Sequence, residues 1–95
     1  MPYIKPELRK LVDEPLMNLI ERVAWSLPLM DDDQKAGTLN YLITKLILAL
    51  YPKELSRYRH HNEVIGVLES AKQEYYRRLV APYEDKKIEE SGDVY

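Results

Sequence analysis

Aromatic rings and guanidinium groups alternate in one short segment near the C-terminus. Tyr76, Arg77 and Tyr83 stand close together there, with Arg78 beside them. Tyrosine rings stack on nucleobases and arginines bind phosphate groups, so this mixture predicts a nucleotide-like ligand. The carboxylates that follow from Glu84 onward would repel a large polyanion, which favours a small phosphorylated ligand held between subunits. The alternative is that the arginines pair with those carboxylates in a seam between copies of the chain.

A second group of residues, Asn62, Gly66, Glu69, Gln73 and Tyr76, recurs at spacings of three and four. These spacings place them on one side of a helix, about 120° from its apolar side. We expect Asn62 and Glu69 to read the polar edges of a base or sugar. Gly66 lies on the same side and costs a helix about 1 kcal/mol relative to alanine, which predicts close approach by another helix or by a ligand.

The preceding helix is predicted to have a polar side of a similar kind. Asn40 and Thr44 are four residues apart, and so are Tyr41 and Lys45. They offer a stacking ring, a positive charge and an amide to a polar ligand, although an ordinary solvated face is the alternative. The predicted ligand-binding residues are therefore Asn40, Tyr41, Thr44, Lys45, Asn62, Glu69, Tyr76, Arg77 and Tyr83.

Nothing in the sequence predicts a catalytic site, a metal site or a cofactor. His60 and His61 are adjacent, so they point to different sides of a helix and do not suit one metal ion. The chain has no cysteine, no glycine-rich phosphate loop, no nucleophile elbow and no Ser-His-Asp order. We therefore expect a protein that is not an enzyme.

The composition predicts a small cytoplasmic protein. Its 95 residues, 45% of them hydrophobic, suit one domain with a marginal core that self-association would complete. The absence of cysteine fits an intracellular location, and no apolar run is long enough for a membrane span or a signal peptide. The net charge of −2 gives no overall attraction to nucleic acid. We expect a homo-oligomer with neither a membrane nor a nucleic-acid partner.

Prolines and apolar spacing divide the chain into helices. Pro15 fits the first turn of one helix, and Pro28 with the acidic run after it predicts a surface loop. Thr38 is the predicted N-cap of the helix with the strongest apolar stripe, which Pro52 ends, and Gly92 ends the last helix. The predicted segments are an arm over 1–13, helices over 14–27, 38–51, 56–81 and 82–91, and a tail over 92–95.

These segments predict an all-α fold. No stretch alternates apolar and polar residues in the manner of a strand. We expect a single helical domain over 1–95, in which three to four helices form a compact antiparallel arrangement that homo-oligomerisation completes. The candidate site requires 56–81 to be one continuous helix, because only then do its two sides face different surroundings.

The C-terminal half resembles a family of short, uncharacterised bacteriophage and prophage proteins. The resemblance covers Gly37 to Tyr95, and its pattern YRRxxAPYED...GDVY begins here at Tyr76 and resumes at Gly92. It implies a phage setting and no established activity. Ser70 stands where similar proteins carry cysteine, which excludes a thiol role. The matching positions are Asn40, Tyr41, Thr44, Asn62, Gly66, Glu69, Tyr76, Arg77, Arg78, Pro82, Tyr83, Glu84, Gly92, Asp93 and Tyr95.

The resemblance and the residue set together favour one function. Small helical phage proteins often counter host defences, and some are oligomeric sponges that sequester a nucleotide second messenger. By this analogy we expect a non-enzymatic anti-defence protein that binds and sequesters a small, cyclic or linear, nucleotide-like signalling molecule. The alternative is a protein–protein adaptor or inhibitor that uses residues 57–61 and the acidic tail against a host defence protein.

Overall fold

The computed structural model describes residues 4–95, and every regular element in this range is helical. The predicted all-α class is confirmed. The described residues form two units, 4–56 and 57–95, and each is considered by itself. The expected single domain and its antiparallel packing stay predictions. None of the helices in residues 4–95 has the length and apolar character needed to cross a membrane.

The first unit begins with helix α1, which spans Pro6–Ser26. Pro6 stands in its first turn, where a missing amide hydrogen costs nothing. The predicted arm over 1–13 and the predicted start near residue 14 are wrong, because the helix runs on through Pro15. Pro15 leaves one carbonyl in the preceding turn without its donor, but helix-forming residues on both sides hold the backbone. Residues 1–3 of the predicted arm lie outside the described residues.

Helix α2 spans Asp32–Leu50 and so takes up most of the predicted loop. The reason is a capping box at its start. The Asp31 carboxylate accepts the Gln34 amide hydrogen at 2.8 Å, and the Gln34 side chain accepts the Asp31 amide hydrogen at 3.0 Å. Thr38, the predicted N-cap, lies inside α2, and its hydroxyl donates to the Met30 sulfur at 3.7 Å.

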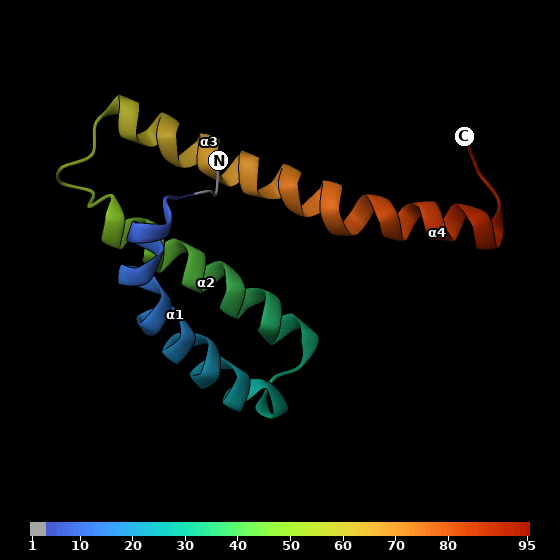
Figure 1. The fold of residues 1–95 in the computed structure, drawn as a ribbon, viewed down its shortest axis with the longest axis horizontal. Coiled ribbons are helices and arrows are strands. Elements are labelled where there is room, and N and C mark those ends of the chain that lie inside the picture. Colours follow the sequence, from blue (N-terminus) through green and yellow to red (C-terminus); the bar gives the residue numbers. More distant parts are fainter. Residues whose placement is uncertain (1–3) are drawn as a thin grey trace. The chain divides into compact units, whose positions relative to one another are not determined.

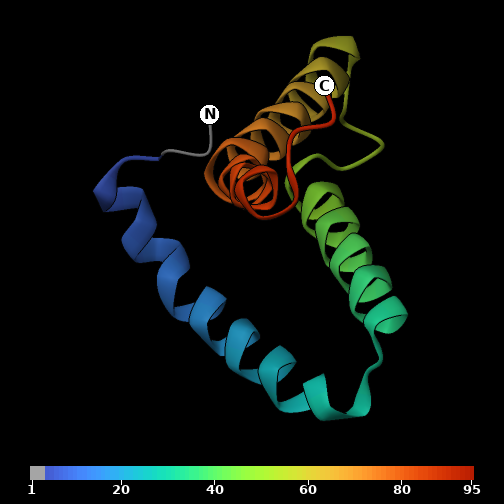
Figure 2. The same cartoon turned by 90° about the vertical axis from the view of Figure 1, so that its right-hand side faces the viewer.

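A short turn joins the two helices of this unit. It contains a 3-10 segment over Leu27–Leu29, after which the chain enters α2 (Figure 1). Apolar side chains from both helices meet there, and Figure 2 shows α1 and α2 diverging away from the turn. Side chains of both helices line one small pocket at the turn. The apolar side chains that line it are Val23, Leu27, Met30, Leu39 and Leu42.

The second unit is one uninterrupted helical run, drawn from yellow to red in Figure 1. It consists of α3 (Tyr58–Tyr75), a π-helical segment (Tyr76–Val80) and α4 (Ala81–Ser91). His60 caps its start, because its Nδ1 accepts the Arg57 amide hydrogen at 2.9 Å. The helix predicted over 56–81 thus starts two residues later, at Tyr58, and stays helical through Gly66.

The π segment explains how the run passes Pro82 without breaking. Proline lacks an amide hydrogen, and its ring crowds the carbonyl four residues earlier in an α-helix. The Ala81 amide hydrogen bonds to the Tyr76 carbonyl five residues back, which widens the turn just before Pro82. The run ends as predicted at Gly92, whose φ of 85° favours glycine.

No residue of the range 4–95 is buried. Within the first unit, Trp25 is 86% exposed and Leu50 is 77% exposed. The apolar stripe expected to form the core of the 38–51 helix lies on α2, but its side chains are only half-buried or exposed. The described chain thus has helices with apolar sides and no closed core.

Candidate functional site

The four predicted residues of α2 interact mainly within their own helix. The Thr44 hydroxyl donates to the Asn40 backbone carbonyl at 2.9 Å, so the helix itself uses that hydroxyl. The Lys45 ammonium lies 5.5 Å from the centre of the Tyr41 ring, a cation–π contact. All four side chains are exposed. They form two interacting pairs on a solvated helix face.

Tyr41 also lines a shallow groove at the turn between α1 and α2. The groove combines apolar side chains with amide and hydroxyl groups. It is the part of the predicted α2 site that has a concave surface. The lining residues are Ser26, Leu29, Met30, Gln34, Gly37, Thr38 and Tyr41.

Glu69 is tied to the next turn of α3. Its carboxylate accepts a hydrogen bond from the Gln73 amide at 3.2 Å and pairs with the Lys72 ammonium at 3.7 Å. Asn62 lies exposed nearer the start of the same helix. The two residues share one helix face, as their spacing predicts.

Arg77 and Arg78 both bind the Glu74 carboxylate. The Arg77 Nη2 lies 3.0 Å and the Arg78 Nε 2.9 Å from one Glu74 oxygen. The hydrogen bond from Arg77, and next that from Arg78, lowers the pKa of the Glu74 carboxyl below its ordinary value. Within the described chain both arginines therefore pair with a carboxylate of their own helical run, and the seam between copies stays a prediction. Glu74 stands three residues before Arg77 and four before Arg78, the spacings at which helical ion pairs form.

Tyr76 bonds to α4 across the π segment. Its hydroxyl donates to the two Glu84 carboxylate oxygens at 3.2 and 3.3 Å. This hydrogen bond raises the pKa of the Tyr76 hydroxyl above its ordinary value, because the carboxylate stabilises the protonated phenol. In an α-helix, residues eight apart lie about 80° apart around the axis, whereas one extra residue in a π turn reduces this to about 20°. The π segment therefore brings the Tyr76 and Glu84 side chains close enough to form this hydrogen bond.

Tyr83, the last predicted residue, lies one turn beyond the π segment. The Lys87 ammonium sits 5.6 Å from the centre of its ring. The Tyr41–Lys45 and Tyr83–Lys87 pairs thus repeat one arrangement, a lysine four residues after an exposed tyrosine. A stacking ligand at either ring would have to share it with, or displace, the lysine.

Three predicted residues come together in one depression on the second unit. Glu69, Tyr76 and Arg77 line it together with Lys72, Gln73 and Glu74. It offers an aromatic ring, an amide, two cationic groups and two carboxylates, which suits a small polar ligand carrying both hydrogen-bonding edges and negative charge. Asn40, Tyr41, Thr44 and Lys45 belong to the other unit, so the joint pocket stays a prediction.

Sequence reasoning missed Glu74, which organises this depression. The signal was present, because Glu74 precedes Arg77 by three and Arg78 by four residues, the spacings at which helical ion pairs form.

The sequence also predicted that another helix or a ligand approaches the backbone at Gly66. Around a Cβ built at Gly66, no atom of the described chain lies within 4 Å.

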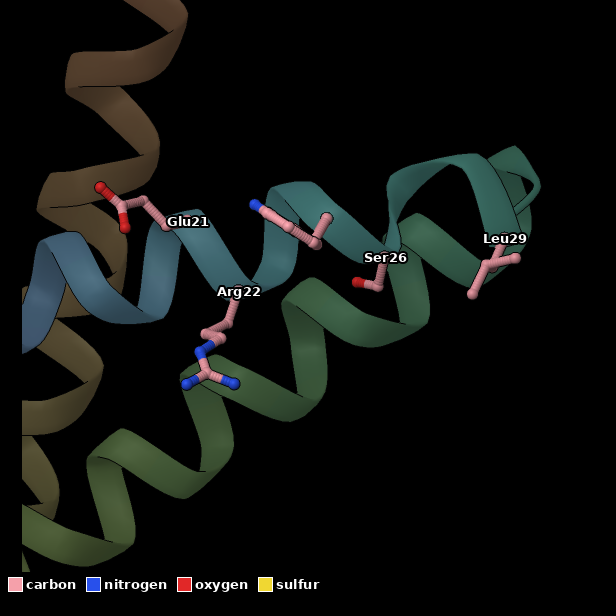
Figure 3. Close-up of a pocket in the computed structure, with 5 residues that line it drawn as sticks. Glu21, Arg22, Ser26 and Leu29 are labelled. Atoms are coloured by element: carbon pink, nitrogen blue, oxygen red, sulfur yellow. The ribbon is translucent and has the colours of Figure 1, made fainter.

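A second shallow groove, which sequence reasoning did not single out, lies along α1. Figure 3 shows Glu21 and Arg22 projecting to different sides of the helix and Leu29 at the far end of the groove, beyond Ser26. The exposed indole of Trp25 is part of its wall. An acid, a base and apolar side chains at one surface suit a protein partner better than a small charged ligand. No cluster of metal-binding side chains occurs in residues 4–95.

Comparison with known proteins finds one family. The family described as Domain of unknown function (DUF6899) matches residues 1–94 of the chain. No curated protein matches the chain, and neither does any solved structure.

Proposed function

The chain belongs to the DUF6899 family, and we propose that it acts as a non-enzymatic helical binding protein that completes its fold by self-association. One observation carries this proposal: residues 4–95 contain no buried side chain, although apolar side chains occur on every helix. An isolated helix with an exposed apolar stripe is marginal in water, since packing of that stripe supplies most helical stability. A second copy would supply the missing burial and an antiparallel packing partner.

Self-association is tested by varying the protein concentration. Burial between copies makes the melting temperature rise with concentration, because mass action favours the assembled state. Sedimentation equilibrium and thermal unfolding followed by circular dichroism should therefore report an oligomer and a concentration-dependent Tm. A monomer whose Tm is the same at all concentrations would overturn the proposal.

The ligand that we propose for this assembly is a small nucleotide-like signalling molecule. The depression around Tyr76 and Arg77 supports it, since one surface there offers a ring for stacking, charged groups for phosphate and the Gln73 amide for a base edge. In the phage setting that the C-terminal resemblance implies, sequestration of such a molecule in the host cytoplasm would counter a host defence.

A thermal-shift screen with cyclic and linear nucleotides tests this ligand. A nucleotide at one hundred times its Kd should stabilise the protein by about 2.7 kcal/mol. Arg77→Gln should remove the shift, while Arg59→Gln, which makes the same charge change outside the depression, should keep it. If no nucleotide shifts the melting temperature of the wild-type protein, nucleotide sequestration is wrong and self-association is unaffected.

An adaptor or inhibitor of a host protein is the second candidate. The groove beside Trp25, which combines an exposed indole with Glu21 and Arg22, supports it, because aromatic and arginine side chains are enriched at protein interfaces. A purified host protein that binds Tyr76→Ala and Arg77→Gln variants normally, but not Trp25→Ala, would favour this function over nucleotide binding.

A further inference from the structure

One apolar stripe follows the helical run of the second unit from Val64 to Tyr83. In α3 its members are three and four residues apart and fall within about 60° around the axis. The π segment inserts one residue, so positions beyond it stay in line only at spacings of four and eight. Leu79 and Tyr83 stand four and eight residues after Tyr75. The stripe comprises Val64, Leu68, Ala71, Tyr75, Leu79 and Tyr83.

The Tyr76–Glu84 hydrogen bond supports this register independently. These residues are also eight apart, and their side chains meet at 3.2 Å across the π segment. Tyr75 and Tyr83 are each one residue earlier, so the same rotation brings them into line on the neighbouring face. The π segment therefore keeps the stripe straight past Pro82.

The run cannot cover this stripe by itself. Tyr75 is 62% exposed, Leu79 57% and Tyr83 61%. The three consecutive elements have 18, 5 and 11 residues, which corresponds to a rod roughly 50 Å long. The stripe itself, from Val64 to Tyr83, takes up roughly 30 Å of this rod. At about 10 Å wide it covers about 300 Å² on each copy, or about 600 Å² in a pair, so the side chains that flank the stripe must complete the roughly 1,000 Å² of a specific interface.

The charges of the unit indicate the direction of the partner. Residues 57–78 contain five Lys and Arg against three Asp and Glu, whereas residues 79–95 contain two Lys and Arg against five Asp and Glu. A parallel second copy would bring equal charges together. An antiparallel copy brings the basic part of each run beside the acidic part of the other, and it also opposes the two helix dipoles.

We propose that the occupant of the stripe is the same stripe of a second copy, antiparallel, with Tyr75 beside the two-fold axis. Residues at matching heights before and after Tyr75 then face each other. Ala71 opposes Leu79, four residues away on either side, and Leu68, seven residues before, opposes Tyr83, eight residues after, because the π segment adds one residue. The small side chain of Ala71 leaves room for Leu79, as interdigitating layers require. This inference rests on the proposed self-association and adds its interface and direction.

Cysteine cross-linking tests the direction, because the chain has no cysteine of its own. Val64 and Lys87 lie 11 and 12 residues on either side of Tyr75, near the stripe. Purified Val64→Cys and Lys87→Cys variants are mixed under mild oxidation. An antiparallel pair should yield roughly tenfold more mixed covalent dimer than the covalent homodimer that either variant forms alone. Gly66→Cys and Asp85→Cys, equally spaced but on the opposite side, are the matched control and should not cross-link.

The outcomes separate the interface from self-association itself. Mixed dimer with the first pair alone supports the proposal, and homodimers of each single variant would mean a parallel pair. Failure to cross-link in a protein that sediments as an oligomer would overturn this interface and leave self-association standing. If the wild-type protein sediments as a monomer, both proposals fail.

Discussion

At the scale of single residues, the candidate site is a set of internal hydrogen bonds and ion pairs that a ligand would enter. Glu74 holds Arg77 and Arg78 on one carboxylate, and Glu84 holds the Tyr76 hydroxyl. These pairs are exposed, so they add little to stability, but they set the orientation of the ring and the guanidinium groups. An anionic ligand would compete with Glu74 for the arginines, since it offers them the same acceptor chemistry.

Glu84→Gln should lower the pKa of Tyr76 toward the ordinary tyrosine value. The carboxylate of Glu84 raises that pKa, and a neutral amide would lose most of the effect. For a group whose folded pKa is raised, the stabilisation is present below the ordinary tyrosine pKa and is lost as pH rises through the raised value. NMR titration of tyrosine labelled at Cζ measures the shift, and Glu89→Gln is the control. An unchanged Tyr76 pKa in Glu84→Gln would contradict the contact.

At the scale of elements, the ends of the helices depend on a few side chains. The Asp31–Gln34 capping box starts α2 several residues before the predicted start, and the π segment carries the second unit past Pro82. Both features rearrange only one turn of backbone. Their consequences are larger, because the first removes a loop and the second keeps the side chains on both sides of Pro82 in register.

Asp31→Ala should destabilise the protein by about 1 kcal/mol. The substitution removes the acceptor for the Gln34 amide hydrogen, and alanine at an N-cap typically costs this amount. Urea unfolding followed by circular dichroism at 222 nm measures the change at one protein concentration. Asp33→Ala, also near the start of α2 but outside the capping box, should cost only a few tenths of a kcal/mol. Equal effects of the two substitutions would argue against the box.

Gly66→Ala should stabilise the protein by about 1 kcal/mol. The position is in the middle of α3, where alanine has the higher helix propensity, and a Cβ there meets nothing within 4 Å. Gly66 also lies away from the proposed seam, so self-association should not change. Thermal and urea unfolding provide the measurement, with Gly92→Ala expected to destabilise because of its φ of 85°. A loss of stability or of assembly in Gly66→Ala would mean that a partner approaches this backbone.

At the scale of the whole molecule, burial is the missing quantity. A small domain normally derives its stability from a closed apolar core, and residues 4–95 contain none. The helices of these residues present exposed apolar stripes. A partner, which we propose is a second copy, converts exposed stripes into a core.

Tyr75→Asp should weaken self-association by about thirtyfold, corresponding to roughly 2 kcal/mol for an aromatic residue at the centre of an interface. A charge at the proposed two-fold axis would face its own copy across an apolar seam, which costs both burial and repulsion. Sedimentation equilibrium measures the dissociation constant. Tyr58→Asp introduces the same change at an exposed position outside the stripe and should leave the constant nearly unchanged. If the two variants dimerise equally well, the axis is not at Tyr75.

The sequence by itself determined the helical class, the end of the last helix at Gly92 and the shared face of Glu69 and Tyr76. These features follow from interactions within one or two turns, which propensity, glycine at a C-terminus and the 3.6-residue period express directly. The capping box at Asp31 and the Glu74 ion pairs are equally local, so the same sequence contained their signals although they were missed.

Only the tertiary structure decided that α1 continues through Pro15, that a π segment precedes Pro82, and that the apolar stripes remain uncovered. Whether a helix continues through a proline depends on the energetic cost of that proline relative to the helix propensities of its neighbours. The spacing of apolar residues does not report this difference. Burial depends on which surfaces pack together. The periodicity of a sequence shows which face of a helix is apolar, but it does not show what packs against that face. For this protein, the residues therefore predict the helices, while the cover of their apolar stripes is left to the self-association that we propose.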